Sequence, residues 1–239
     1  MQVIDLPASA GAAWIKISFA IFRAQPAGWI SLVVAWLMLS IALHFFPFYI
    51  GQAVATILIP GFFAGFVIAA RDQEAGQPVG AHQLFGAFRV NGRALVTLGA
   101  ITLLIDILLM VLFAALDLPQ TIPKGADGKA DYDVLRQSLE GKTWTVLGGF
   151  ALVVVIKGAL WFTAAILALN RMPATHAIRW SCYALIANFF PMLVFGILMM
   201  CIFTLAIVPL LLGFLVATPI YAIAQYVSYR DLFRPSAEA

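Results

Sequence analysis

The feature that most constrains this chain is a pair of long stretches without charged side chains. The 43 residues from 28 to 70 contain no Asp, Glu, Lys or Arg, and neither do the 50 residues from 180 to 229. One α-helix crosses a hydrocarbon core of about 30 Å in about 20 residues. Each stretch is therefore long enough to cross a membrane and return, and we expect two helical hairpins.

Composition supports the same conclusion. Of 239 residues, 63% are hydrophobic and 10% are charged, whereas soluble domains average roughly 45 to 50% and 25%. The formal charge of +3 is too small and too scattered to indicate a nucleic-acid partner. Two cysteines cannot form a disulfide framework. Lys16, Arg23 and Pro26 interrupt the first apolar segment, so we expect no cleaved signal peptide.

We predict an all-α integral membrane protein, with one polytopic domain over residues 1–239 and six transmembrane helices. A proline and a glycine within residues 46–51 divide the first uncharged stretch, and a tight turn around Val208 and Pro209 divides the second. The predicted spans are residues 28–46, 52–70, 94–116, 144–169, 190–207 and 210–228, with an outer loop at 117–143.

The distribution of basic residues predicts the topology, because Lys and Arg concentrate in short cytoplasmic loops. With six spans, nine basic residues fall on one side: Lys16, Arg23, Arg71, Arg89, Arg93, Arg171, Arg179, Arg230 and Arg234. The outer loop instead mixes four basic with five acidic residues. We expect a multi-pass protein of the bacterial inner membrane with cytoplasmic N- and C-termini.

The segments that precede spans 1, 3 and 5 resemble one another. Residues 16–18 and 24–25 match residues 179–181 and 187–188 at an offset of 163, and residues 22–25 match residues 88–91 at an offset of 66. We interpret these segments as three amphipathic helices at the cytoplasmic interface, each turning at its Gln or Asn into the next span. The alternative is that the matches arose by chance, because the matched windows are short.

The first of these segments projects well onto an amphipathic helix. Lys16 and Arg23 lie on one side, whereas Trp14, Ile17 and Phe22 lie on the other. We expect the apolar side to enter the acyl boundary while the basic residues meet anionic lipid. The predicted headgroup contacts are Lys16, Arg23, Arg89 and Arg179.

Asp106 and Lys157 are the two charges that this assignment places deep in the membrane. An unpaired charge at a helix centre costs about 2.5 to 3.5 kcal/mol on insertion scales. The distances of the two residues from the ends of spans 3 and 4 put them at depths that differ by about 3 Å. We predict an intramembrane ion pair, which is either a structural clasp between two helices or part of a transport pathway.

Motifs of common enzymes are absent from the sequence. It contains no HExxH, GxxxxGK[ST], GxSxG or CxxC pattern. The three histidines fall in separate segments, so we expect no metal and no cofactor. In the outer loop, Asp131 is positioned to cap a short helix.

Three segments carry a resemblance to known proteins: MQVIDLPASAGAAWIKISFAIFRAQPAGWI, LFGAFRVNGR and YAIAQYVSYRDLF. The chain resembles, over nearly its whole length, a family of betaproteobacterial inner-membrane proteins with a locus-derived name and no assigned activity. It is more distantly similar to bacterial membrane domains that alternate interfacial helices with spans, including those attached to some glycerophosphodiester phosphodiesterases. The resemblance implies location and architecture and assigns no catalytic residue.

Taken together, these observations favour a non-enzymatic inner-membrane protein that acts through lipid or protein contacts. The partners we expect are membrane lipids, with a second copy of the chain or another membrane protein as further possibilities. The alternative function is a small-solute or ion permease that uses Asp106 and Lys157.

Overall fold

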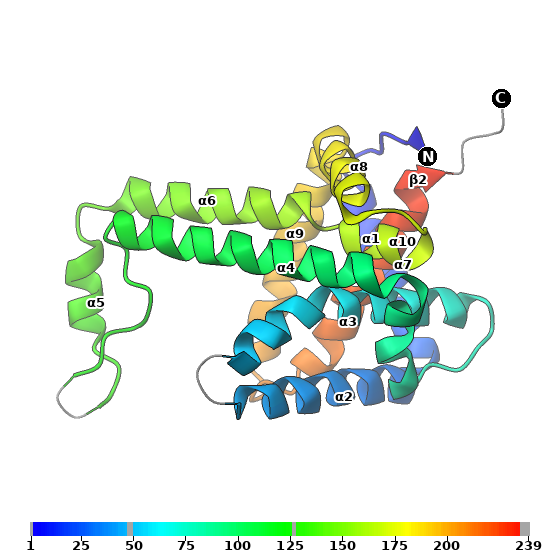
Figure 1. Ribbon diagram of the computed structural model, residues 1–239, viewed down its shortest axis with the longest axis horizontal. Coiled ribbons are helices and arrows are strands. Elements are labelled where there is room, and N and C mark those ends of the chain that lie inside the picture. The colour runs from blue at the N-terminus through cyan, green and yellow to red at the C-terminus, as the bar shows by residue number, and fades with distance from the viewer. Residues whose placement is uncertain (1, 47–49, 126–127, 235–239) are drawn as a thin grey trace. The chain divides into compact units, whose positions relative to one another are not determined.

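The computed structural model describes residues 2–46, 50–125 and 128–234. The chain forms two compact units, residues 1–100 with 159–239 and residues 101–158, and each is described by itself. Its helices, labelled in Figure 1 except for η1, are α1 Ala10–Ala24, α2 Pro26–His44, α3 Ile50–Glu74, η1 Ala81–Phe85, α4 Gly86–Ala115, α5 Tyr132–Leu139, α6 Thr143–Ala159, α7 Thr163–Leu169, α8 Ala174–Ala187, α9 Phe189–Ile207 and α10 Phe214–Leu232. The short strands β1 Gln2–Val3 and β2 Phe233–Arg234 pair in antiparallel orientation.

Among the described residues, five helical segments are long and apolar enough to cross a membrane: Pro26–His44, Ile50–Glu74, Ala81–Ala115, Thr143–Leu169 and Phe189–Ile207. They coincide with the first five predicted spans. The sixth, residues 210–228, corresponds to α10, which is not among them because its second half carries Gln225, Arg230 and Asp231. The sixth crossing therefore stays a prediction.

The structure corrects one predicted span and describes the first predicted reversal only in part. The fourth span, predicted as one helix over residues 144–169, is two helices, because α6 ends at Ala159 and α7 begins at Thr163. The first reversal lies partly outside the described residues, since α2 ends at His44, α3 begins at Ile50 and residues 47–49 are not described.

The predicted turns at Gln25, Asn91 and Asn188 are confirmed. Each residue leaves helical geometry, with φ and ψ of −143° and 59° at Gln25, −150° and 49° at Asn91, and −120° and 39° at Asn188. Helix precedes and follows each of them. The chain thus repeats one pattern three times: a segment that precedes predicted span 1, 3 or 5 (a pre-span segment), a kink at an amide side chain, and further helices that end with α3, α7 or α10. We refer to residues 1–74, 75–173 and 174–234 as the first, second and third repeats.

The core of the larger unit is built from the last helix of each repeat. These inner helices, α3, α7 and α10, all contact one another. Their facing residues are mostly small or apolar, and many are fully buried, including Ala64, Phe66, Ala165 and Ala222. Inside a bilayer the hydrophobic effect does not drive helices together. Small side chains stabilise helix association there because they let the helix backbones approach closely.

The apolar side of α1 is covered by protein, which corrects the expectation that it enters the acyl boundary. α1 packs against α9 and α10. Trp14 is 0% and Phe22 6% exposed, and the Trp14 ring meets Phe195 edge-on with centroids 6.2 Å apart. Lys16 and Arg23, on the opposite side, are exposed as predicted.

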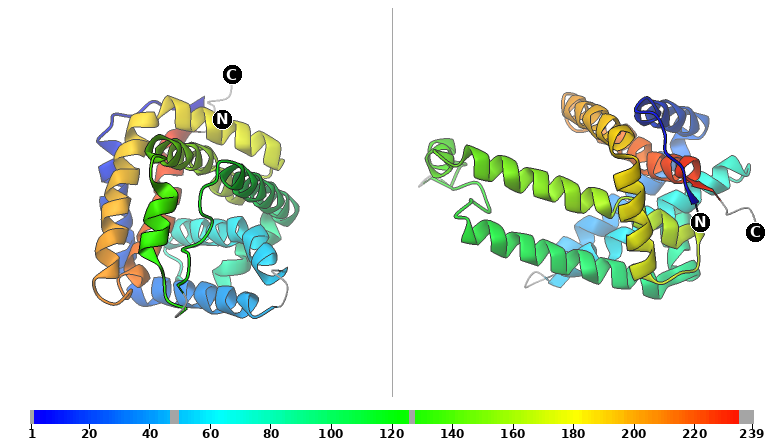
Figure 2. Two further views of the ribbon diagram at one scale, coloured as in Figure 1. Left: turned by 90° about the vertical axis from the view of Figure 1, so that its left-hand side faces the viewer. Right: turned by 90° about the horizontal axis from the view of Figure 1, so that it is seen from above.

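The smaller unit is a helical hairpin with a structured outer loop, drawn in green in Figure 2. It contains the second part of α4, most of α6 and the loop helix α5 between them. The Asp131 carboxylate accepts hydrogen bonds from the backbone N–H groups of Asp133 and Val134 at the start of α5. The predicted cap is therefore confirmed.

Candidate functional site

The three kink residues hold the repeats together in a cyclic order. Each uses its amide side chain to bind the backbone just before the next pre-span segment. Gln25 accepts a hydrogen bond from Val79 N at 2.8 Å, and Asn91 donates to Met172 O at 3.0 Å. Asn188 closes the cycle, because its side chain bonds both Leu6 N at 3.0 Å and Ile4 O at 2.9 Å.

Packing follows the same order. The second pre-span segment begins with η1, which contacts α2 and α3 of the first repeat, whereas α8 contacts α7 of the second. The first pre-span segment, α1, contacts α9 and α10 of the third. Each pre-span segment is thus placed by the repeat before it, and the amide kinks fix where its basic residues lie.

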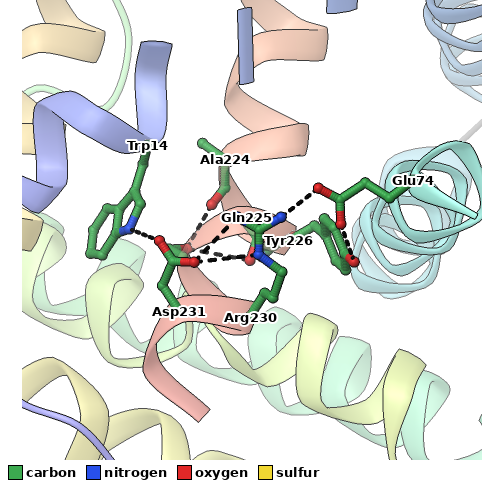
Figure 3. Close-up of polar contacts among 8 residues, drawn as sticks. Trp14, Glu74, Ala224, Gln225, Tyr226, Arg230 and Asp231 are labelled. Atoms are coloured by element: carbon green, nitrogen blue, oxygen red, sulfur yellow. Dashed lines mark hydrogen bonds and ion pairs between the residues drawn. The ribbon is translucent and has the colours of Figure 1, made fainter. Parts of the chain in front are cut away.

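A polar network joins the ends of α3 and α10 with α1 (Figure 3). Arg230 forms ion pairs with Glu74 and Asp231, and the Tyr226 hydroxyl donates to Glu74 at 2.7 Å. The Trp14 indole N–H donates to the Asp231 carboxylate at 3.1 Å. The network therefore uses acidic groups that would otherwise be available to other basic residues.

The structure shows a correspondence between the ends of the inner helices that the sequence reasoning missed. Pro60 precedes Arg71-Asp72 by the same spacing as Pro219 precedes Arg230-Asp231, at an offset of 159. Both aspartates bind the next pre-span segment: Asp72 accepts from the Gln83 side chain at 3.3 Å, and Asp231 accepts from Trp14. The signal was the repeated spacing from proline to the Arg-Asp pair.

The second repeat departs from this pattern. At an offset of 100 from the first repeat, Arg171-Met172 follows α7, so methionine stands where the other two repeats have aspartate. Ala177 stands on α8 where Trp14 stands on α1. Within the part of the chain that the structure describes, Arg171 is exposed and has no ion pair.

The four predicted headgroup contacts are spread over the three pre-span segments. Lys16 and Arg23 lie on α1, Arg89 lies at the start of α4, and Arg179 lies on α8. All four are exposed, and none forms an ion pair with a described residue. Arg23 lies over the Phe19 ring at 5.8 Å, and Arg179 lines a cleft of about 680 Å³ with His176 and Tyr183. The structure does not bring the four together into one cluster.

The structure does bring Asp106 and Lys157 together. The Lys157 ammonium forms an ion pair and hydrogen bond with the Asp106 carboxylate across the α4–α6 hairpin. Their side chains are 39% and 42% exposed in the protein. Neither lines the clefts described here. The pair therefore links the two helices of the hairpin, and both its role as a structural clasp and its role in transport stay predictions.

Two further contacts set the hairpin register toward the outer loop. The Phe113 ring lies against Gly149. Beyond it, the Lys142 ammonium lies 2.6 Å from both a carboxylate oxygen and the backbone oxygen of Asp117. The hydrogen bond and charge of Lys142 hold the pKa of the Asp117 carboxyl below its usual range, so this carboxyl is ionised at neutral pH.

Metal binding has no cluster to support it among the residues that the structure describes, where no three His, Cys, Asp or Glu side chains gather. Cys182 is partly buried and Cys201 is exposed, and both are free thiols. Among the described residues, the exposed basic side chains Lys16, Arg23, Arg89 and Arg179 are available for ion pairing and hydrogen bonding.

Comparison with known proteins agrees with a membrane location. No protein-family model matches the chain, and no solved structure matches it. A probable inner membrane protein of Burkholderia thailandensis is 27% identical over 210 residues, which cover 83% of this chain and 75% of that protein. This chain, with several helices able to cross a bilayer, is similar to a probable bacterial inner-membrane protein.

Proposed function

We propose that this chain is a non-enzymatic protein of the bacterial inner membrane that binds anionic lipid headgroups through its pre-span segments. The observation that carries the proposal is an imbalance of charge. Lys16, Arg23, Arg89 and Arg179 are exposed and unpaired among the described residues. The neighbouring acids Asp72, Glu74 and Asp231 are already bound to other groups.

The proposal includes six spans and cytoplasmic termini. The polar network supports this topology, because Trp14, Glu74, Arg230 and Asp231 come from three segments that the basic-residue distribution assigns to one side. Basic residues near the cytoplasmic leaflet gain about 1 kcal/mol each from its anionic lipids. The inner-membrane location agrees with the name of the Burkholderia protein.

The test is the lipid composition that the protein retains. We expect purified protein in nanodiscs of phosphatidylglycerol and phosphatidylcholine to enrich the anionic lipid around itself, as measured by native mass spectrometry. The double variant Lys16→Gln, Arg23→Gln should reduce that preference by about thirtyfold, because two contacts of about 1 kcal/mol each are lost.

The matched control is Lys124→Gln, Arg136→Gln, which likewise removes one lysine and one arginine, here from exposed positions of the outer loop. It should leave the preference unchanged. An equal loss in both double variants, or no anionic enrichment by the original protein, would contradict the proposal.

A permease is the second candidate, and the Asp106–Lys157 pair is the observation that favours it. Ionisable groups inside membrane helices often mark transport pathways. Proteoliposomes loaded with a panel of ions and small metabolites should then show flux that Asp106→Asn abolishes. A tight bilayer under all these gradients counts against transport.

A further inference from the structure

A cleft of about 530 Å³ lies where the second repeat meets the third. Its lining includes Arg93 and Arg171, together with Thr175 at the start of α8, Ala94 and Met172. Asn91 positions one wall, because its amide holds the Met172 carbonyl. Both arginines are exposed and form no ion pair with the described part of the chain.

At the corresponding positions of the other two junctions, a glycine lets the backbones pack closely. Where the first repeat meets the second, the Val79 carbonyl packs onto Gly28, and a Cβ at Gly28 would lie 2.5 Å from it. Ala94 occupies the matching position in the second repeat. Because alanine has a Cβ, a backbone carbonyl cannot approach Ala94 as closely as Val79 approaches Gly28. Where the third repeat meets the first, the glycine is on the other partner: a Cβ at Gly11 would lie 2.2 Å from the carbonyl oxygen of Pro191, the counterpart of Gly28.

The other two repeats also lack the unpaired arginines that line this cleft. Arg93 aligns with Ala27 in the first repeat and with Phe190 in the third. Arg71 and Arg230, the counterparts of Arg171, each pair with the aspartate that follows them, and Arg171 is followed by Met172. The second repeat has therefore gained one arginine, lost one carboxylate and kept an opening between them.

We propose that this cleft binds a phosphate group, with Arg93 and Arg171 as its cationic ligands. Guanidinium groups bind phosphate oxygens through paired, charge-assisted hydrogen bonds, and an incoming anion replaces the carboxylate that Arg171 lacks. The first turn of α8 adds to the site, because Pro173 provides no side-chain cap and the backbone N–H groups there favour an anion.

The phosphate has two possible sources, a phospholipid headgroup and a soluble phosphate ester. The lipid form of the inference rests on the proposed function, and the soluble form does not. The apolar wall formed by Val90, Ala94 and Met172 suits the glycerol and acyl carbons of a lipid. We therefore expect phosphatidylglycerol to bind more tightly than glycerol 3-phosphate.

The experiment titrates the full chain in detergent with phosphatidylglycerol, phosphatidylcholine or glycerol 3-phosphate and counts bound molecules by native mass spectrometry. We expect one phosphatidylglycerol bound with highest affinity. Arg93→Gln and Arg171→Gln should each weaken that first binding step about tenfold. Arg136→Gln in the outer loop is the matched charge control and should not change it.

Met172→Asp provides the sharpest variant, because it keeps both arginines and restores the Arg-Asp sequence of the other repeats. The new carboxylate should pair with Arg171 and weaken phosphatidylglycerol binding about as much as Arg171→Gln. A thermal unfolding midpoint at or above that of the original protein shows that the fold is kept, and Met172→Leu is its isosteric control.

The outcomes separate this inference from the proposed function. Equal binding by the original protein and the three cleft variants overturns the cleft site, even if anionic lipid remains enriched through Lys16 and Arg23. Binding of glycerol 3-phosphate without any lipid preference overturns the lipid form and supports a soluble phosphate ester.

Discussion

Single amide side chains decide how the repeats of this protein join. Gln25, Asn91 and Asn188 each end one helix and begin the next. Gln25 and Asn188 also bind the backbone of another repeat, whereas Asn91 binds the backbone of its own repeat just before the third repeat begins. A side chain with both a donor and an acceptor suits this position, because it can satisfy backbone N–H and C=O groups that no helix or sheet uses.

Asn188 should be the most sensitive of the three. It is 0% exposed and makes two hydrogen bonds to the chain before α1. Asn188→Ala leaves both backbone groups without their partner, and we expect a loss of about 2 kcal/mol in the free energy of unfolding. The measurement is the thermal midpoint in detergent, with Gln120→Ala in the exposed loop as control. A midpoint equal to that of the control would contradict the closing role of Asn188.

At the residue scale, the sequence predicted pairings that depend on depth or spacing along one helix. The Asp106–Lys157 contact followed from two distances to span ends, and the Asp131 cap followed from its place before a helix. The partners of Glu74 and Asp231 could not be predicted in this way. They depend on how α3, α10 and α1 pack, and these elements are far apart in the sequence.

The α4–α6 hairpin shows what an element gains from charges at matched depth. Its helices are held by the Asp106–Lys157 pair and, near the outer loop, by Asp117 and Lys142. The first pair lies in segments able to cross a bilayer, whereas the Asp117 side chain is 94% exposed. Unpaired charge costs far more in hydrocarbon than at a surface, so the inner pair should matter more.

Replacing the inner pair tests this ranking. Asp106→Asn leaves Lys157 without its anion, and Lys157→Gln leaves Asp106 without its cation, so both should lower folded yield in detergent. The exchange of both residues, Asp106→Lys with Lys157→Asp, should recover part of the loss. Lys142→Gln in the same hairpin is the control and should cost less than about 1 kcal/mol. Full yield from both single variants would show that the clasp is not needed.

At the element scale, the sequence predicted which segments are helical and missed two features of their packing. The break at residues 160–162 escaped detection because Leu160-Trp161-Phe162 contains neither proline nor glycine. Its position matches Pro60 and Pro219, so alignment of the repeats was the available signal. The apolar side of α1 was assigned to lipid because periodicity identifies a buried face without identifying what buries it.

For the whole molecule, the topology can be tested directly. A reporter inserted after Gly76, in the loop between α3 and η1, should lie in the cytoplasm. A reporter after Ile122, in the outer loop, should lie in the periplasm. The reason is that Arg71, Arg89 and Arg93 lie on the helices on either side of the first loop, whereas the outer loop has mixed charge. Paired fluorescent and alkaline phosphatase fusions measure both, and a shared compartment would overturn the six-span arrangement.

At this scale, the sequence revealed three similar segments and concealed the order in which they bind. The matches at offsets of 163 and 66 located the pre-span segments and their amide kinks. Each kink residue binds the backbone just before the next pre-span segment, and this contact forms only when the three repeats pack together. The phosphate cleft was hidden for the same reason, because Arg93 and Arg171 are distinctive only when the repeats are compared.

The contact between Asn188 and the start of the chain can form only late in biosynthesis. Leu6 and Asn188 are 182 residues apart, and bacterial and eukaryotic ribosomes add about 5 to 20 residues per second. Trp14 therefore waits roughly 10 to 40 s for the helices that will cover it. During that interval the indole must be buried in the bilayer surface or in the insertion machinery. A nascent chain halted before α9 would leave the apolar side of α1 uncovered, and its N-terminal end would be prone to association and proteolysis.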